Sequence, residues 1–143
     1  GTQAIEMKDL SRKMLRDSDG RRWMIQAFYP TPVSTAQLNP YMPGTLENGI
    51  IKGRRVLAHS QLNAPLLTQK PLSVIIFIPG LGGERQKYTL LCEELASHGY
   101  VVLSFDQPYV SNFVRFLNGD KIVLTLKDAW KIPRDRDYRY QYY

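Results

Sequence analysis

The clearest pattern of hydrophobic positions lies in the middle of the chain. Residues 74–78 (VIIFI) are continuously apolar and rich in β-branched side chains, which is typical of a strand buried on both faces of a parallel sheet. Residues 100–105 form a second run of this kind. Between the two runs, apolar side chains recur at helical spacing, at Tyr88, Leu91, Cys92, Leu95 and Ala96. A strand, a helix and a second strand in this order predict a βαβ unit with a right-handed, parallel crossover.

An alternating pattern precedes this unit. In residues 22–29 the apolar side chains of Trp23, Ile25, Ala27 and Tyr29 share one face, so we expect a strand with two unlike faces. Residues 17–20 (DSDG) form a turn signal just before it. We therefore expect residues 7–16 to form the preceding strand and to pair back onto residues 22–29 as an antiparallel meander.

The segments on either side of the βαβ unit have weaker patterns. Residues 30–71 contain several prolines and glycines and no sustained period, so we expect a long loop with at most short helical pieces, of the kind that covers a site. Residues 113–117 and 120–124 flank Asn118-Gly119, which predicts a hairpin with a type I′ turn. The tail from Pro133 has the sequence of a helix N-terminus and no C-terminal capping signal, so we expect a helix that is truncated at Tyr143.

Composition and charge exclude several classes of protein. With 143 residues, 43% hydrophobic and 22% charged, the chain is typical of one globular domain and unlike a disordered, collagen-like or membrane-spanning sequence. Its single cysteine cannot form an internal disulfide and leaves the cellular compartment open. The net charge of +6 comes from basic and acidic residues that are mixed at both ends, which argues against nucleic acid as a partner. The histidines and the cysteine lack metal-binding spacing, so we expect neither a metal nor a cofactor.

The main candidate for chemistry is the segment Pro79-Gly80-Leu81-Gly82-Gly83, which follows the first central strand and precedes the helix. Glycines at this place let backbone N–H groups approach an anion closely. A dinucleotide is disfavoured as that anion, because Arg85 stands where the third glycine of G-x-G-x-x-G belongs, although Asp106 does end the second strand. The other candidate is the oxyanion of an acyl-transfer intermediate, which a turn between a strand and a helix stabilises in α/β-hydrolases.

Residues 22–143 resemble an α/β-hydrolase of the platelet-activating-factor acetylhydrolase and dienelactone-hydrolase-like group. The matching segments are RWMIQAFYPT, VIIFIPGLGGERQKYTLLCEELASHGYVVLSFDQP, VRFLNGDKIV and DYRYQYY. The resemblance implies that the Leu81 N–H is an oxyanion-hole donor and that Gly80, Gly82 and Gly83 shape the turn around it. The chain departs from the group at Pro79, where many members have histidine.

Other residues near this segment have less specific roles. Asp106 and Gln107, at the end of the second central strand, are candidate substrate contacts, and Asp106 is also explained as a strand-end residue that stabilises the next turn. No serine lies in a G-x-S-x-G motif. We expect His59 to be a loop residue and His98 to lie beside the helix C-terminus, both outside a catalytic triad, and Cys92 to be a buried side chain rather than a reactive thiol.

These features predict an α/β fold, namely the N-terminal half of an α/β-hydrolase sheet in which an antiparallel meander leads into a parallel βαβ unit. Residues 1–143 would then be the N-terminal part of a single domain. The resemblance implies a serine-dependent carboxylic ester hydrolase acting on a lipid or short acyl ester. Its nucleophile, acid and histidine would lie on a C-terminal half that docks against the exposed parallel edge of this sheet, so this chain alone would be inactive. The alternative is a hydrolase-like module that binds an acyl or anionic ligand without catalysis.

Overall fold

The computed structural model describes residues 1–11, 20–32, 37–41, 50–51, 53–67 and 70–127. Its helices and strands, in chain order, are β1 (Thr2–Asp9), β2 (Arg21–Phe28), β3 (Leu38–Pro40), β4 (Ile50–Ile51), β5 (Arg54–Arg55), β6 (Leu57–Gln61), β7 (Val74–Phe77), the 3₁₀ helix η1 (Arg85–Tyr88), α1 (Thr89–Ser97), β8 (Val101–Asp106), β9 (Phe113–Arg115) and β10 (Lys121–Val123). None of the helices among these residues has the length and apolar character needed to cross a membrane.

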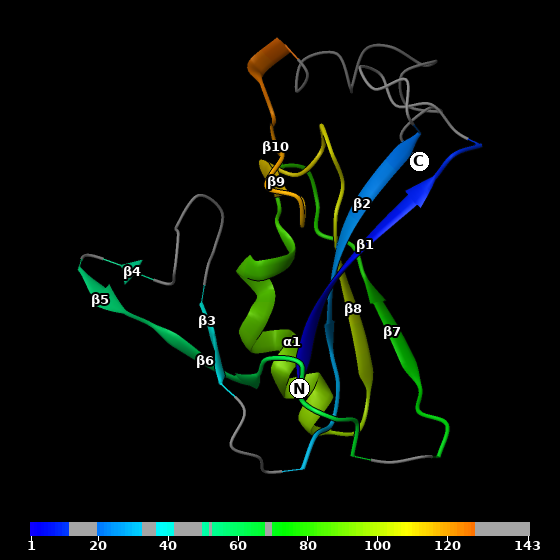
Figure 1. Cartoon of the computed structure of the whole chain (residues 1–143), viewed down its shortest axis with the longest axis vertical. Coiled ribbons are helices and arrows are strands. Elements are labelled where there is room, and N and C mark those ends of the chain that lie inside the picture. Colours follow the sequence, from blue (N-terminus) through cyan, green and yellow to red (C-terminus); the bar gives the residue numbers. More distant parts are fainter. Residues whose placement is uncertain (12–19, 33–36, 42–49, 52, 68–69, 128–143) are drawn as a thin grey trace.

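A four-stranded mixed sheet of order β1-β2-β8-β7 organises the chain. β2 pairs antiparallel with both β1 and β8, whereas β7 and β8 run parallel. α1 connects β7 to β8 and lies against one face of the sheet (Figure 1). The predicted βαβ unit is therefore confirmed, and so is the antiparallel meander that leads into it.

The N-terminal strand lies earlier in the sequence than predicted. β2 has nearly the expected bounds, but its partner β1 begins at Thr2, and the register runs from Thr2 opposite Phe28 to Asp9 opposite Arg21. The prediction of a strand over residues 7–16 is thus wrong, because the turn signal was taken to lie directly between the two strands. Gly20 immediately precedes β2 and has φ +103°. A Cβ added there would lie 2.6 Å from the Asp9 carbonyl oxygen. Residues 12–19 lie outside the described part of the chain.

Both faces of β2 are buried, contrary to the two unlike faces that its alternation predicts. Ile25 and Ala27 on one face are 3% and 5% exposed, and Met24 and Phe28 on the other are fully buried. On one face, Phe28 packs in a cluster with side chains of α1, and Met24 packs in a cluster with side chains of the β9–β10 segment. The other face of β2 lies between the side chains of its two neighbouring strands, β1 and β8. The alternation of apolar and polar residues depends on the side chains of the strand itself and gives no information about the elements that pack around it.

Among the described residues, two core clusters lie on the face of the sheet that carries α1. The larger cluster joins sheet and helix through Phe28, Cys92, Ala96 and Val102, with Ile75, Phe77 and Leu95 packed against them. The smaller cluster joins Met24 to Val114 and Phe116 of the β9–β10 segment, with Ala4 and Ile122 beside them. Cys92 is 0% exposed, as its position on the helix predicts.

β7 lies at the edge of the sheet rather than in its interior (Figure 1). Ile75 and Phe77 pack against the larger core cluster, but Val74 and Ile76 on the opposite face are 56% and 63% exposed. The prediction of a strand buried on both faces is therefore wrong for this chain. The continuous apolar run fits a strand with neighbours on all sides, whereas in the described part of the chain β7 pairs only with β8.

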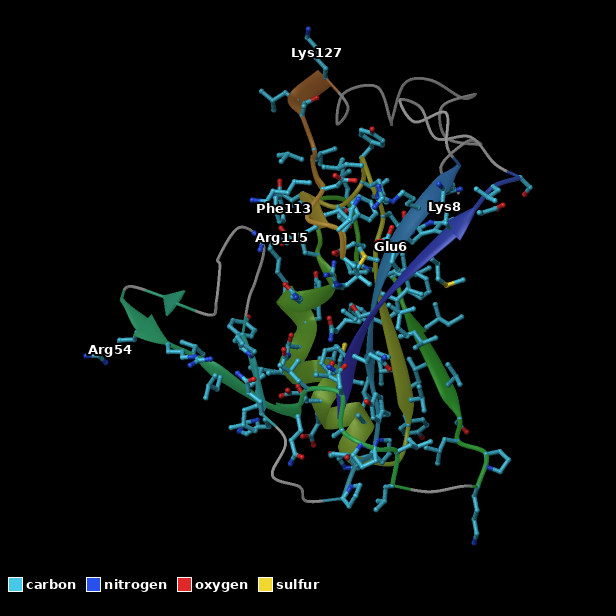
Figure 2. The ribbon with its side chains drawn as sticks, in the orientation of Figure 1. Glu6, Lys8, Arg54, Phe113, Arg115 and Lys127 are labelled. Atoms are coloured by element: carbon cyan, nitrogen blue, oxygen red, sulfur yellow. The ribbon has the colours of Figure 1, made fainter. Side chains whose placement is uncertain are left out.

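The described residues between 30 and 71 include four short strands, contrary to the predicted loop with at most short helical pieces. β3 pairs antiparallel with β6, and β4 with β5, so two small strand pairs extend from the body of the molecule (Figure 1). Arg54, on β5, lies at the far tip of this extension (Figure 2). The strands are short and carry many polar side chains, so no hydrophobic period marks them in the sequence.

The predicted hairpin is present, with a different turn. β9 and β10 pair antiparallel with Arg115 opposite Lys121, and the Phe116 N–H donates to the Asp120 carbonyl oxygen at 2.9 Å, which leaves residues 117–119 as the loop. The Gly119 N–H donates to the Phe116 carbonyl at 3.1 Å, and Gly119 has φ +91° while Asn118 has no positive φ. This is a type I turn followed by a left-handed glycine, so the type I′ turn is a wrong prediction. The helix expected from Pro133 lies outside the described residues.

Candidate functional site

The glycine-rich segment forms a tight turn at the C-terminal end of β7. The Gly83 N–H donates to the Gly80 carbonyl oxygen at 2.7 Å, which closes a four-residue turn over residues 80–83. Gly82 has φ +76° and Leu81 has no positive φ, which together identify a type II turn with Leu81 at its second position. We call residues 80–83 the glycine turn.

Two N–H groups of the glycine turn, those of Gly80 and Leu81, have no acceptor among the described residues. The Gly82 N–H donates to the Val110 carbonyl oxygen at 2.8 Å, and the Gly83 N–H is used within the turn. Leu81 itself is 56% exposed. The turn therefore offers the Leu81 N–H to a ligand, at the residue that the resemblance assigns to an oxyanion.

Arg85, which follows the glycine turn by two residues, forms a buried ion pair with Asp106. The Arg85 N–H donates to Asp106 Oδ1 at 2.6 Å, and the Arg85 guanidinium contacts Asp106 Oδ2. The Arg85 carbonyl accepts a hydrogen bond of 3.1 Å from the Ser104 hydroxyl. Asp106 is 2% exposed, and its burial raises the pKa of its carboxyl above the usual value, while the charge of Arg85 acts in the opposite direction. Asp106, a predicted substrate contact, thus has both carboxylate oxygens engaged by Arg85.

The sequence interpretation gives no partner for Asp106, although a signal for Arg85 exists, because an arginine follows the glycine turn and an aspartate ends the next strand. In a βαβ unit with adjacent parallel strands these two places meet at the same edge of the sheet. As a departure from a dinucleotide motif, the arginine by itself predicts nothing about Asp106.

Gln107, the other predicted substrate contact, begins a tightly bonded loop of residues 107–111. Its backbone N–H donates to the Ser111 hydroxyl at 2.9 Å. Its carbonyl accepts hydrogen bonds from the Val110 and Ser111 N–H groups at 3.1 and 2.7 Å. The Gln107 side chain is partly exposed and makes no hydrogen bond to any described residue, so it is available to a ligand.

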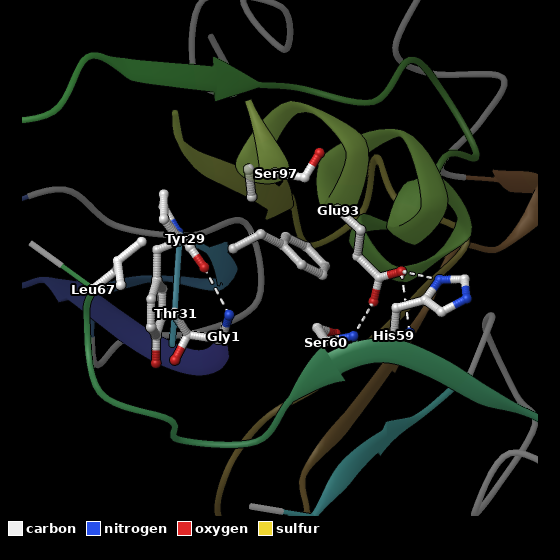
Figure 3. Close-up of a pocket in the computed structure, with 11 residues that line it drawn as sticks. Gly1, Tyr29, Thr31, His59, Ser60, Leu67, Glu93 and Ser97 are labelled. Atoms are coloured by element: carbon white, nitrogen blue, oxygen red, sulfur yellow. Dashed lines mark hydrogen bonds and ion pairs between the residues drawn. The ribbon is translucent and has the colours of Figure 1, made fainter. Parts of the chain in front are cut away.

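A cavity of about 360 Å³ lies away from the glycine turn, beside α1, β6 and the end of β2 (Figure 3). It brings together Ser60, His59 and Glu93, the residue types of a catalytic triad. Ser60 and His59 are neighbours on β6, so their side chains point to opposite faces, and the His59 side chain is 92% exposed. The carboxylate of Glu93 accepts the Ser60 N–H at 2.7 Å and also lies 3.5 Å from His59 Nδ1, but the Ser60 and His59 side chains point apart. These residues do not form a nucleophile and base pair.

The predicted place is confirmed for His98 and wrong for His59. His59 lies in β6, not in a loop as predicted, with Nδ1 3.5 Å from Glu93 Oε2. His98 follows the last residue of α1, and its Nδ1 lies 2.8 Å from the Glu94 carbonyl oxygen, to which the Ser97 hydroxyl also donates. The described residues hold no group of three or more metal-ligating side chains.

Comparison with known proteins agrees with this geometry. The platelet-activating factor acetylhydrolase, isoform II family matches residues 35–132, more than half of the chain. A probable 1-alkyl-2-acetylglycerophosphocholine esterase from Arthroderma benhamiae is 26% identical over 166 residues, which covers 97% of this chain and 43% of that protein. The ferulic acid esterase from Streptomyces cinnamoneus is similar in structure, with a TM-score of 0.75 and 28% identity over 98% of this chain and 44% of that one.

The chain thus spans less than half the length of these two relatives. Its mixed sheet is similar to part of an esterase α/β-hydrolase fold, the fold class that the sequence predicts. The match of the family model and the similarity to both esterases lead to one conclusion: the chain belongs to the platelet-activating factor acetylhydrolase, isoform II family.

Proposed function

We propose that the protein containing this chain hydrolyses carboxylic esters through a serine nucleophile, with the Leu81 N–H as one donor of the oxyanion hole. The observation that carries the proposal is the exposed Leu81 N–H, which has no acceptor among the described residues while the next two N–H groups of the turn, at Gly82 and Gly83, are used. Both relatives described above are named as esterases, which supports the same reaction.

In this reaction the serine Oγ attacks the ester carbonyl and the carbonyl oxygen takes up negative charge. A backbone N–H close to that oxygen stabilises the charge as it develops, because the donor is already oriented before the reaction begins. A histidine takes the serine proton and gives it to the leaving alcohol, and water then releases the acid from the acyl-enzyme. In this chain Leu81 supplies the donor, and the free side chain of Gln107 is a candidate contact with the substrate.

We propose a lipid or short acyl ester as the substrate. The fungal relative is named for an ester of an alkyl-acetylglycerophosphocholine, and the bacterial one for an ester of ferulic acid. Both names describe esters with a small acyl group or an aromatic acid, which supports a site that accepts a compact acyl chain.

We propose that the nucleophile, the acid and the histidine lie on a C-terminal half of the same domain, and that this half docks at β7. The edge of β7 away from β8 presents backbone N–H and C=O groups that have no strand beside them in the described part of the chain. The exposed side chains of Val74 and Ile76 extend an apolar surface from that edge. This chain covers only 43% of the fungal relative, so more than half of that protein is available to form such a half.

The experiment uses the full-length protein and the substitution Leu81→Pro. Proline is well tolerated at the second position of a type II turn, so this variant removes the N–H donor and keeps the turn. We expect the kcat for hydrolysis of p-nitrophenyl acetate to fall by about 10²- to 10³-fold, the usual loss for one oxyanion-hole donor. Leu81→Ala is the matched control, because it removes the exposed side chain, keeps the N–H and should retain activity.

The nucleophile is located by labelling the full-length protein with a serine-reactive phosphonate and mapping the labelled peptide. We expect the label on a serine within G-x-S-x-G, outside residues 1–143. A label on a serine of this chain would contradict the proposed division of the site. No hydrolysis and no label would favour a hydrolase-like module that binds its ligand without catalysis.

A further inference from the structure

We propose that Asp106 is a positioning residue for the oxyanion hole, acting on the glycine turn through Arg85 and through the loop of residues 107–111. Asp106 would then touch no substrate; it would set the place of the Leu81 N–H. This inference rests on the proposed function and assigns the buried ion pair a part in it. In this proposal Asp106 positions the turn, whereas the sequence predicts that it contacts the substrate directly.

The first connection runs through the backbone of Arg85. Asp106 Oδ1 accepts the Arg85 N–H at 2.6 Å, and the guanidinium of the same residue contacts Oδ2, so one carboxylate holds Arg85 at both ends. From the same strand, the Ser104 hydroxyl donates to the Arg85 carbonyl at 3.1 Å. Arg85 comes two residues after Gly83 in the sequence. Its fixed backbone therefore fixes where the glycine turn ends.

The second connection reaches the middle of the turn. The Val110 carbonyl accepts the Gly82 N–H at 2.8 Å, and Val110 is 4% exposed. The loop that presents this carbonyl starts directly after Asp106 and is closed by the hydrogen bond of 2.9 Å from the Gln107 N–H to the Ser111 hydroxyl. Tyr109 adopts φ +66° within it, a conformation that a tyrosine keeps only when the surroundings impose it.

Both connections originate at the C-terminal end of β8, the strand beside β7. They fix the turn residues on either side of the peptide that carries the Leu81 N–H and leave that donor free. Arg85 and Asp106 are 6% and 2% exposed, so water does not compete for their contact. Loss of the carboxylate would leave Arg85 buried without its partner and would release the turn from its neighbouring strand.

The test compares Asp106→Ala and Asp106→Asn with Glu93→Ala in the full-length protein. Glu93 is a matched control, because its carboxylate is also largely buried and also accepts a backbone N–H, from Ser60 at 2.7 Å, but it lies on the far side of α1 by the cavity. Each variant is assayed on p-nitrophenyl acetate at a temperature at which circular dichroism shows it folded. Amide hydrogen exchange of Gly82 is measured on the same samples.

We expect Asp106→Ala to lower kcat by about 10- to 100-fold with KM nearly unchanged, since a displacement of about 1 Å in a reacting group has effects of this size. Asp106→Asn should recover part of the loss, because its amide oxygen still accepts the Arg85 N–H. Glu93→Ala should keep the wild-type kcat. Exchange at the Gly82 amide should become faster in Asp106→Ala, in Asp106→Asn to a smaller extent, and in Ser111→Ala, whose loop lacks one of its three internal hydrogen bonds, and should stay slow in Glu93→Ala.

Three results would overturn the inference. The first is a wild-type kcat in Asp106→Ala, and the second is an equal loss in Glu93→Ala, which would indicate a general effect of removing a buried carboxylate. The third is unchanged Gly82 exchange in both Asp106→Asn and Ser111→Ala, a result that stands even if Asp106→Ala does not fold. A wild-type protein with neither hydrolysis nor phosphonate labelling would instead refute the proposed function, and the inference with it.

Discussion

Gly83 is the position in the glycine turn that tolerates a side chain least. A Cβ added there would lie 2.5 Å from the Pro79 Cβ and 2.8 Å from the Gly80 carbonyl oxygen. Carbon atoms in contact are normally about 3.5–4.0 Å apart, so Gly83→Ala must move the turn or Pro79 by about 1 Å. Overpacking of this kind costs about 1–3 kcal/mol of stability. A displacement of about 1 Å at a reacting group costs about 100-fold in rate.

The assay measures Gly83→Ala in the full-length protein by urea unfolding and by hydrolysis of p-nitrophenyl acetate. Gly80→Ala is the matched control, because its added Cβ has no atom within 4 Å and its φ is not positive. We expect Gly83→Ala to be less stable by about 1–3 kcal/mol and much less active than Gly80→Ala. Equal stability and equal activity of the two variants would refute the argument that the turn must pack closely at Gly83.

Three further predictions concern the sheet and its helix. Phe28→Ala should lower the free energy of unfolding by about 3–5 kcal/mol, because Phe28 is 0% exposed in the larger core cluster; a loss below about 1 kcal/mol in urea unfolding would contradict this packing. Burial raises the pKa of Cys92 from 9.0 to about 11, so its reaction with Ellman's reagent should be slow at pH 8 in the folded protein and rise only toward pH 11. The folded state then binds the thiol proton more tightly, and this contribution to stability is lost as the pH rises from 9.0 to about 11. Gly99→Ala should cost about 1 kcal/mol in calorimetry, because φ is +92° with open space around the added Cβ, so backbone strain alone opposes it.

The sequence predicts those elements whose signal is local. The apolar runs of β7 and β8, the helical period of α1 and the order of the βαβ unit are all confirmed, because a buried strand and an amphipathic helix have distinct periods within a few residues. The glycine turn is predicted for the same reason, since Gly82 occupies a left-handed conformation that other residues rarely adopt.

The remaining errors concern what lies beside an element. The apolar run of β7 gives no information about its place at the edge, and the alternation of β2 does not show that strands flank it on both sides. The turn of the β9–β10 hairpin depends on register, which Asn118-Gly119 alone does not determine. The ion pair of Arg85 with Asp106 depends on the adjacency of two parallel strands, so it follows from topology rather than from spacing.

The strand order has a consequence for how the chain assembles. β2 pairs with β8 through contacts such as Ile25 with Phe105, which are far apart in the sequence, whereas the β1–β2 hairpin and the β7-α1-β8 unit form from local contacts. Non-local pairing is slow because loop closure must precede any gain in contacts. During synthesis from the N-terminus, the β1–β2 hairpin therefore emerges before the strand that pairs with β2 in the sheet, which is complete only when Asp106 has left the ribosome. We expect the joining of the two units along β2 and β8 to limit the rate at which this sheet folds.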